Sequence, residues 1–70
     1  MDFELFRFAD LSAKMFFVTE SDYDSCIGYI KVTDDKGNHF WENFEGHSER
    51  DMTIAKAMLH VADNMANRAN

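Results

Sequence analysis

The chain has little of several things that common functional sites require. Its 70 residues include one cysteine, three glycines and no proline. A single cysteine, Cys26, cannot form a disulfide within the chain, so apolar packing has to supply the stability. The three glycines stand apart from one another, which argues against a phosphate-binding glycine loop. No apolar run approaches the ~18 residues that a membrane-spanning helix needs.

Basic residues are also scarce. Seven Lys and Arg stand against 13 Asp and Glu, for a net charge of −6. Nucleic-acid binding depends on clustered lysine and arginine, and the basic residues here are scattered from Arg7 to Arg68. We therefore expect no direct nucleic-acid binding and no membrane contact. The acidic balance suits a partner with a basic surface, although ordinary solubility is the simpler interpretation of such a charge.

The residue types that carry catalysis or bind metals show no useful spacing. Cys26, His39, His47 and His60 are singletons, whereas zinc sites usually pair their ligands at short spacing. A nucleophilic pair of Cys26 and His39 is disfavoured by the acidic segment next to the cysteine, which we interpret as a small buried hydrophobe. Most carboxylates fall in turns, where aspartate bonds its own backbone. We expect no enzyme activity, no metal and no cofactor.

The lone cysteine and the acidic start of the chain, where a secretory signal would be basic, predict a reducing compartment. We therefore expect a cytoplasmic protein, located in the host cytoplasm if it is phage-encoded.

Patterning predicts one domain over residues 1–70, of the α+β class. We expect a small antiparallel β-sheet in a β-β-β-β-α meander, with one amphipathic helix packed on one face. The turn chemistry of residues 34–38 joins the last two strands as a hairpin, and residues 21–25 are interpreted as an acidic loop. The predicted strands cover about residues 3–10, 14–20, 26–33 and 39–44, and the helix covers about 49–67.

The segment 3–10 leaves an alternative open, an α-β-β-β-α order. That order at this length is typical of double-stranded-RNA-binding domains, in which a lysine pair at the start of the last helix grips phosphates. Here Glu49-Arg50-Asp51 stands at that place and would repel phosphates, so that function is not expected.

The C-terminal helix carries the clearest pattern. Ser48 is expected to cap it, with Asp51 three residues later completing a capping pattern. Two adjacent apolar stripes predict a broad buried surface suited to a sheet. The first stripe is Met52, Ala55, Leu59, Ala62 and Ala66, and the second is Ile54, Met58, Val61 and Met65. The polar side, with Thr53, Lys56 and His60, should face solvent.

One helix can cover only one face of a four-stranded sheet. Residues 27–32 and 39–44 alternate in a way that leaves large apolar groups on both faces. We therefore predict an exposed aromatic patch of Tyr29 and Trp41, joined by Phe16 or Phe3 and rimmed by acidic loops. The alternative is that loops or chain termini fold over this face. The predicted partner-binding residues are Tyr29, Trp41, Phe16, Asp22, Asp24, Asp34, Asp35 and Glu42.

Two functional classes follow. The first is an acidic protein-binding module, in a narrower form an inhibitor of a basic, nucleic-acid-handling host protein. Small acidic proteins that phages make against host defence share this size and charge. The second is a homodimeric structural or regulatory protein that uses its open sheet face.

Overall fold

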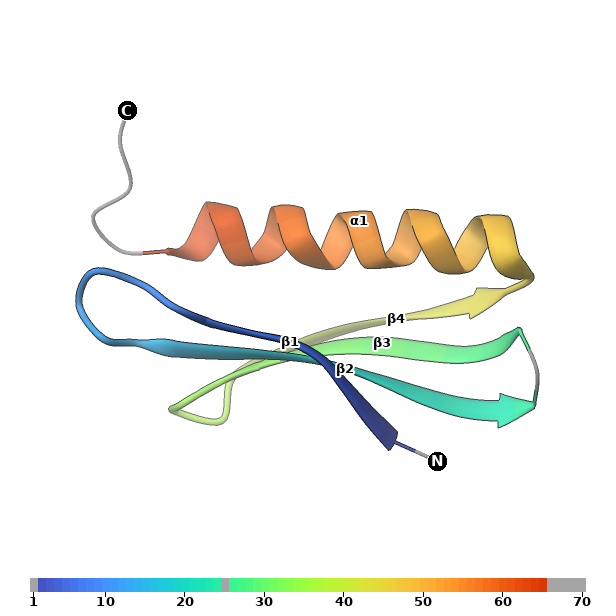
Figure 1. Cartoon of the computed structure of the whole chain (residues 1–70), viewed down its shortest axis with the longest axis horizontal. Helices are drawn as coiled ribbons and strands as arrows, with labels where there is room; N and C mark the ends of the chain where they lie inside the picture. Colours follow the sequence, from blue (N-terminus) through green and yellow to red (C-terminus); the bar gives the residue numbers. More distant parts are fainter. Residues whose placement is uncertain (1, 25, 66–70) are drawn as a thin grey trace.

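The computed structural model describes residues 2–24 and 26–65, with the side chains of Tyr23 and Asp24 outside that description. The chain forms four strands and then one helix, which confirms the predicted α+β meander (Figure 1). The strands pair antiparallel in the order β1-β2-β3-β4. The elements are β1 (Asp2–Ala9), β2 (Met15–Asp24), β3 (Ile27–Asp34), β4 (His39–Glu45) and α1 (His47–Asn64). Residues 3–10 thus hold a strand, and the α-β-β-β-α alternative is not observed.

Two bulges adjust the register of the sheet. One lies in β1 between Glu4 and Phe6. The other lies between Asp22 and Asp24 of β2, so this strand continues through the segment that was predicted to be a loop. The prediction was wrong because β3 supplies pairing partners along this acidic stretch, up to Ile27. Cys26 therefore lies in the turn between the two strands, with a positive φ of 66°.

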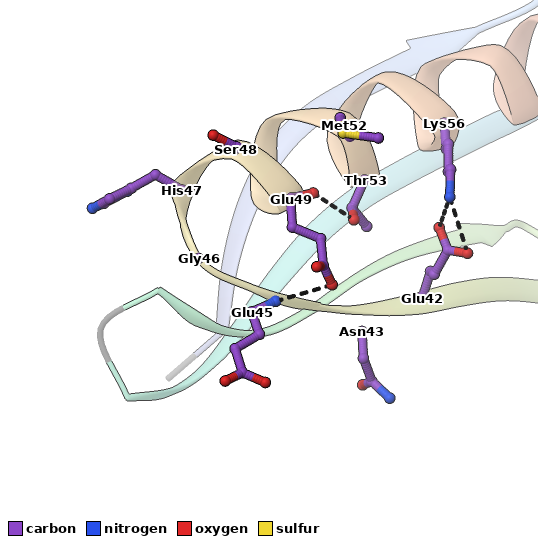
Figure 2. A pocket seen from close by; sticks show the side chains of 10 residues that line it. All are labelled: Glu42, Asn43, Glu45, Gly46, His47, Ser48, Glu49, Met52, Thr53 and Lys56. Carbon is purple, nitrogen blue, oxygen red and sulfur yellow. Dashed lines mark hydrogen bonds and ion pairs between the residues drawn. The ribbon is translucent and has the colours of Figure 1, made fainter.

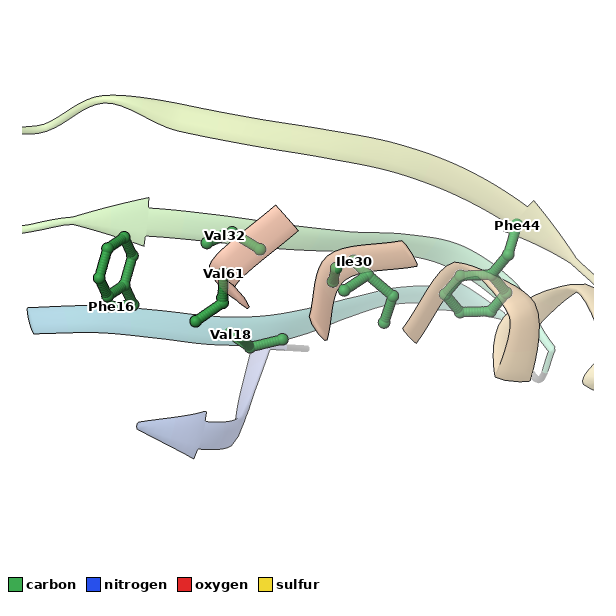
Figure 3. Packing of buried hydrophobic residues seen from close by; sticks show 7 residues of the cluster. Phe16, Val18, Ile30, Val32, Phe44 and Val61 are labelled. Atoms are coloured by element: carbon green, nitrogen blue, oxygen red, sulfur yellow. The ribbon is translucent and has the colours of Figure 1, made fainter. Parts of the chain in front are cut away.

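The core lies between the sheet and the helix (Figure 3). Alternate residues of the two central strands point toward α1, as period-2 patterning predicts. Phe44 of β4 joins them, and the helix contributes small and β-branched side chains. The buried apolar residues are Phe16, Val18, Ile30, Val32, Phe44, Ala57 and Val61.

The helix covers the sheet unevenly. It packs mainly on β3 and β4, and Figure 3 places β1 outside the strip of sheet beneath it. As a result, two aromatic side chains of β1 are only partly covered: Phe3 is 43% exposed and Phe6 is 42% exposed. Both belong to the face of the sheet that α1 occupies, because Phe3 pairs with Glu20 and Phe6 with Val18.

The start of the helix differs from the prediction. Gly46 is the N-cap, with a φ of 95° that favours glycine, and no side chain caps the helix there. Ser48 lies inside the first turn, so its predicted capping role was wrong. The carboxylate of Glu49 instead accepts a hydrogen bond from the Glu45 amide at 3.2 Å. The helix ends at Asn64, and the predicted residues 66 and 67 lie outside the described residues.

The buried face of the helix was only half predicted. Val61 and Ile54 pack on the sheet as expected, but Thr53 is buried and Leu59 is 65% exposed. Thr53 tolerates burial because its hydroxyl donates to the Glu49 carbonyl at 2.8 Å. The described members of the first stripe, Met52, Ala55, Leu59 and Ala62, therefore face away from the sheet.

Candidate functional site

The candidate site is the sheet face opposite α1, which we call the open face. The register places Tyr29 and Lys31 of β3 on this face beside Trp41 of the edge strand β4, with Lys31 paired directly to Trp41. None of the described helices or strands covers this face, since α1 packs on the other one. Trp41 is 52% exposed and Tyr29 is half-buried. The predicted aromatic pair is therefore brought together at the surface.

The two rings form an edge contact. The Tyr29 and Trp41 centroids lie 5.7 Å apart at an interplanar angle of 62°, a geometry that aromatic pairs favour. Lys31 and His39 complete a shallow hollow of about 250 Å³ beside them. A large apolar ring with a polar edge, next to a cation and an imidazole, is suited to anchoring a protein side chain.

The β1 side of the open face carries a second aromatic group. The Arg7 guanidinium lies 5.4 Å from the centroid of the Phe17 ring, which is a cation–π contact. Arg7 also forms an ion pair with Glu4 at 3.0 Å. Phe17 was not among the predicted site residues, because adjacent apolar residues conceal which of them faces outward.

Phe16 was predicted for the patch, and that prediction was wrong. Its side chain lies in the core with 2% exposure. Phe16 pairs with Phe8 and Asp34, whose side of the sheet faces α1, and Phe17 takes the outward position. Phe3 is exposed but also belongs to the side of the sheet that α1 occupies, so it does not join Tyr29 and Trp41.

Two predicted acidic residues, Asp34 and Asp35, lie at the turn between β3 and β4. The Asp34 carboxylate accepts hydrogen bonds from the Lys36 and Asn38 amides, each at 2.9 Å. The Asn38 side chain donates a further bond at 3.0 Å and chiefly accounts for a lowered pKa of Asp34. Lys14 pairs with it at 3.5 Å. Asp34 thus organises its own turn, while Asp35 is exposed.

Asp22 lies on the helix side of β2, at the edge of a charged cluster with Glu20 and Arg50. A hydrogen bond shared with Glu20 raises the pKa of Asp22, whereas the Arg50 guanidinium lowers the pKa of Glu20. Asp22 is therefore directed away from the Tyr29 and Trp41 pair. The side chain of Asp24, another predicted partner-binding residue, lies outside the described residues.

Glu42 occupies the middle of β4, which is an edge strand. Its carboxylate forms an ion pair with Lys56 of α1 at 3.2 Å (Figure 2). Strand alternation puts Glu42 opposite Ile30, on the face away from Trp41. Its predicted contact with a partner stays a prediction. Figure 2 shows Glu42 within a groove between β4 and the start of α1, which Glu49 and Met52 also line.

His39 and His60 both border a hollow near the β3–β4 turn, while His47 lies at the start of α1. His39 also borders the hollow on the open face, and His60 stacks on Phe40 with centroids 4.5 Å apart. His47 lies with its Nε2 atom 2.9 Å from the Cys26 sulfur. Cys26 is half-buried and hydrogen-bonded rather than simply an apolar filler. No sequence signal pointed to this pair, because its members are 21 residues apart and meet only through the β2–β3 turn and the helix start.

The described residues contain no group of three or more His, Cys, Asp or Glu side chains placed to hold a metal ion. Likewise, no helix in the described part of the chain is both long and apolar enough to span a membrane. Comparison with protein-family models, curated proteins and solved structures finds no match to this chain.

Proposed function

We propose that this chain is a non-enzymatic protein-binding module that meets its partner through the open face. The exposure of Trp41 on the edge strand β4, beside Tyr29 of β3, carries the proposal. Tryptophan and tyrosine are enriched among the residues that dominate binding energy. An indole that is half exposed to water is stabilised when a partner covers it.

The groups around the two rings supply a polar rim of mixed sign. The open face carries Asp2, Glu4 and Glu45 toward one end, and Arg7 lies toward the other. Lys31 of β3 lies between Trp41 of β4 and Thr19 of β2. A rim of this kind supports specificity and orientation around a central anchor.

The acidic balance supports a partner with a basic surface. A net charge of −6 attracts such a partner over long distances, which raises the association rate more than the final affinity. Asp34 and Glu42 are already engaged within the chain, so they add to this field without being contact residues of the open face. An inhibitor of a basic, nucleic-acid-handling host protein is the narrower proposal, supported by size and charge.

Capture experiments test the proposal with two matched variants. Trp41→Ala and Leu59→Ala each remove one exposed apolar side chain, from the open face and from the outer side of α1 respectively. We expect a partner captured by the wild-type chain to be retained by Leu59→Ala and to bind Trp41→Ala about 30-fold more weakly. Equal binding to Trp41→Ala and the wild-type chain would contradict an open-face site.

The charge of the partner is tested separately. Changing Asp22, Asp24, Asp34 and Asp35 together to asparagine removes four negative charges and leaves the aromatic pair in place. We expect slower association and a weaker dependence of the rate on salt. An unchanged rate at every salt concentration would argue against a basic partner but not against the open face.

The alternative function is a homodimer joined through the open face. Exposed aromatic rings on a flat sheet also suit an isologous contact. A dimer that survives dilution and is lost in Trp41→Ala would favour this alternative over a separate partner.

A further inference from the structure

We propose that the outer edge of β1 pairs with the same edge of a second copy of this chain. The two strands would run antiparallel about a two-fold axis and join the two four-stranded sheets into one. The open face would stay free on both copies, so this contact is independent of the proposed function.

The β1 edge is exposed in both its backbone and its side chains. Among the described strands, β1 pairs with β2 alone, so the backbone groups of its other side form no ladder with any of them. On the face that α1 occupies, the helix lies over β3 and β4 and leaves Phe3 and Phe6 uncovered. Phe6 and Phe8 lie with ring centroids 6.1 Å apart along this margin. A second copy at this edge would cover the aromatic side chains from the side.

Two antiparallel copies of β1 are complementary to each other when they pair about the middle of the strand. The strand covers Asp2–Ala9, so its midpoint lies between Leu5 and Phe6. A two-fold axis there places Glu4 opposite Arg7 of the second copy, twice. It also places Phe3 opposite Phe8 of the second copy. Opposite charges and aromatic pairs facing each other across strands both stabilise a sheet.

The bulge in β1 makes this pairing possible. In a regular strand, residues three apart point to opposite faces. The bulge shifts the alternation by one, so Glu4 and Arg7 both lie on the open face, opposite Thr19 and Phe17. Phe3 and Phe8 likewise both lie on the helix side. Residues related by the two-fold axis thus share a face, as an antiparallel ladder requires.

The other edge of the sheet lacks this complementarity. The midpoint of β4 (His39–Glu45) is Glu42. An antiparallel pair of β4 strands about that point would set the Glu42 carboxylates of the two copies side by side. Charges on edge strands commonly prevent such pairing. About their midpoints, β1 thus sets carboxylate opposite guanidinium, whereas β4 sets carboxylate beside carboxylate.

Sedimentation velocity and light scattering test the contact with charge-reversal variants. We expect the wild-type chain to reach twice the single-chain mass of 8.1 kDa at micromolar to submillimolar concentration. Glu4→Lys and Arg7→Glu should each weaken self-association by about tenfold or more, because each places like charges opposite one another twice. The double variant Glu4→Lys/Arg7→Glu restores opposite charges and should self-associate again.

Mixing the two single variants gives the sharpest result. Glu4→Lys and Arg7→Glu should form a mixed dimer with each other while each remains monomeric alone. Circular dichroism of each variant establishes that it is folded, and Trp41→Ala serves as the control that leaves β1 intact. A monomeric wild-type chain at these concentrations would overturn the proposal. So would a dimer that is indifferent to both reversals, or one that is lost in Trp41→Ala.

Discussion

The guanidinium of Arg50 donates two hydrogen bonds to the carboxylate of Glu20, from Nε at 2.7 Å and from Nη2 at 2.6 Å. Glu20 belongs to β2 and is buried at 5% exposure, while Arg50 lies near the start of α1. A buried carboxylate is tolerated when a fork of this kind satisfies both of its oxygens. The pair therefore ties the helix to a strand beyond the two on which it mainly packs.

We expect Arg50→Met to lower the free energy of unfolding by about 3 kcal/mol, because it leaves the Glu20 carboxylate buried without its cation. Urea unfolding followed by circular dichroism measures the change. Arg50→Lys keeps the positive charge but cannot form both hydrogen bonds. Its free energy of unfolding should therefore lie between those of Arg50→Met and the wild-type chain. If Arg50→Met were as stable as the wild-type chain, the ion pair between Arg50 and Glu20 would make no net contribution to the free energy of unfolding.

Acidification should weaken the same ion pair. The pKa of Glu20 is lowered from its ordinary value of 4.5, chiefly by the hydrogen bond from Arg50. A lowered folded-state pKa adds stability that is fully present above the unfolded value and is lost as pH falls through the folded value. We therefore expect the stability difference between the wild-type chain and Glu20→Gln to be constant above about pH 5.5 and to shrink as pH falls below 4.5.

Two further carboxyl groups with shifted pKa values, Asp34 and Asp22, set the background of that titration. Asp34 has a lowered pKa and adds stability in the same direction as Glu20. Asp22 has a raised pKa, so its contribution is present below its ordinary value of 3.8 and is lost as pH rises through the folded value. The difference in urea midpoints between the wild-type chain and Glu20→Gln, taken at several pH values, cancels the Asp34 contribution and reports Glu20 together with the Asp22 carboxyl that is hydrogen-bonded to it. An unchanged difference down to about pH 3 would contradict the lowered pKa of Glu20.

The turn between β1 and β2 depends on Asp10. One carboxylate oxygen accepts hydrogen bonds from the Ser12 and Lys14 amides, each at 2.9 Å, and from the Ser12 hydroxyl at 2.7 Å. Asp10→Ala would leave these donors unsatisfied, and we expect it to lower the free energy of unfolding by about 2 kcal/mol. Asp35→Ala is the matched control, because that turn aspartate is exposed and the bond it accepts from the Met15 amide is long, at 3.4 Å. Equal stabilities of the two variants would show that the turn does not need its carboxylate.

Gly28 is required by the close approach of β2 to β3. A Cβ atom at this position would press into the carbonyl oxygen of Ser21 and lie 3.1 Å from the Asp22 Cα. We expect Gly28→Ala to lower the free energy of unfolding by about 3 kcal/mol, measured by urea unfolding. Gly37→Ala is the comparison, since it meets no atom within 4 Å and introduces only the strain of a φ of 85°, about 1 kcal/mol. A smaller loss at Gly28 than at Gly37 would contradict the steric argument.

Local patterns predicted much of the fold. Alternation assigned Ile30 and Val32 to one face and Tyr29 to the other, and the exposed position of Trp41 follows from the same period. The strand–turn–strand chemistry around Gly37 also specified the last hairpin. These signals suffice because each strand carries a contrast between its two faces.

Where that contrast is missing, prediction failed. Phe16 and Phe17 are both apolar, so only the register with Asp34 and Thr33 decides which of them enters the core. On α1, two apolar stripes compete, and the sheet accepts the one that includes Ile54 and Val61. It also buries Ala57, which neither predicted stripe contained and whose small side chain allows a close approach. Cys26 and His47 meet through tertiary structure alone, which no spacing in the sequence encodes.

Trp41 is the only tryptophan in the chain, and it stands on the candidate surface rather than in the core. The intrinsic fluorescence of the protein is thus an optical reporter of the open face. Its emission should lie near that of a hydrated indole and shift to the blue when a partner seals the hollow beside Tyr29. Association through β1 would leave the emission unchanged, so a cuvette measurement without any attached label distinguishes the two modes of contact.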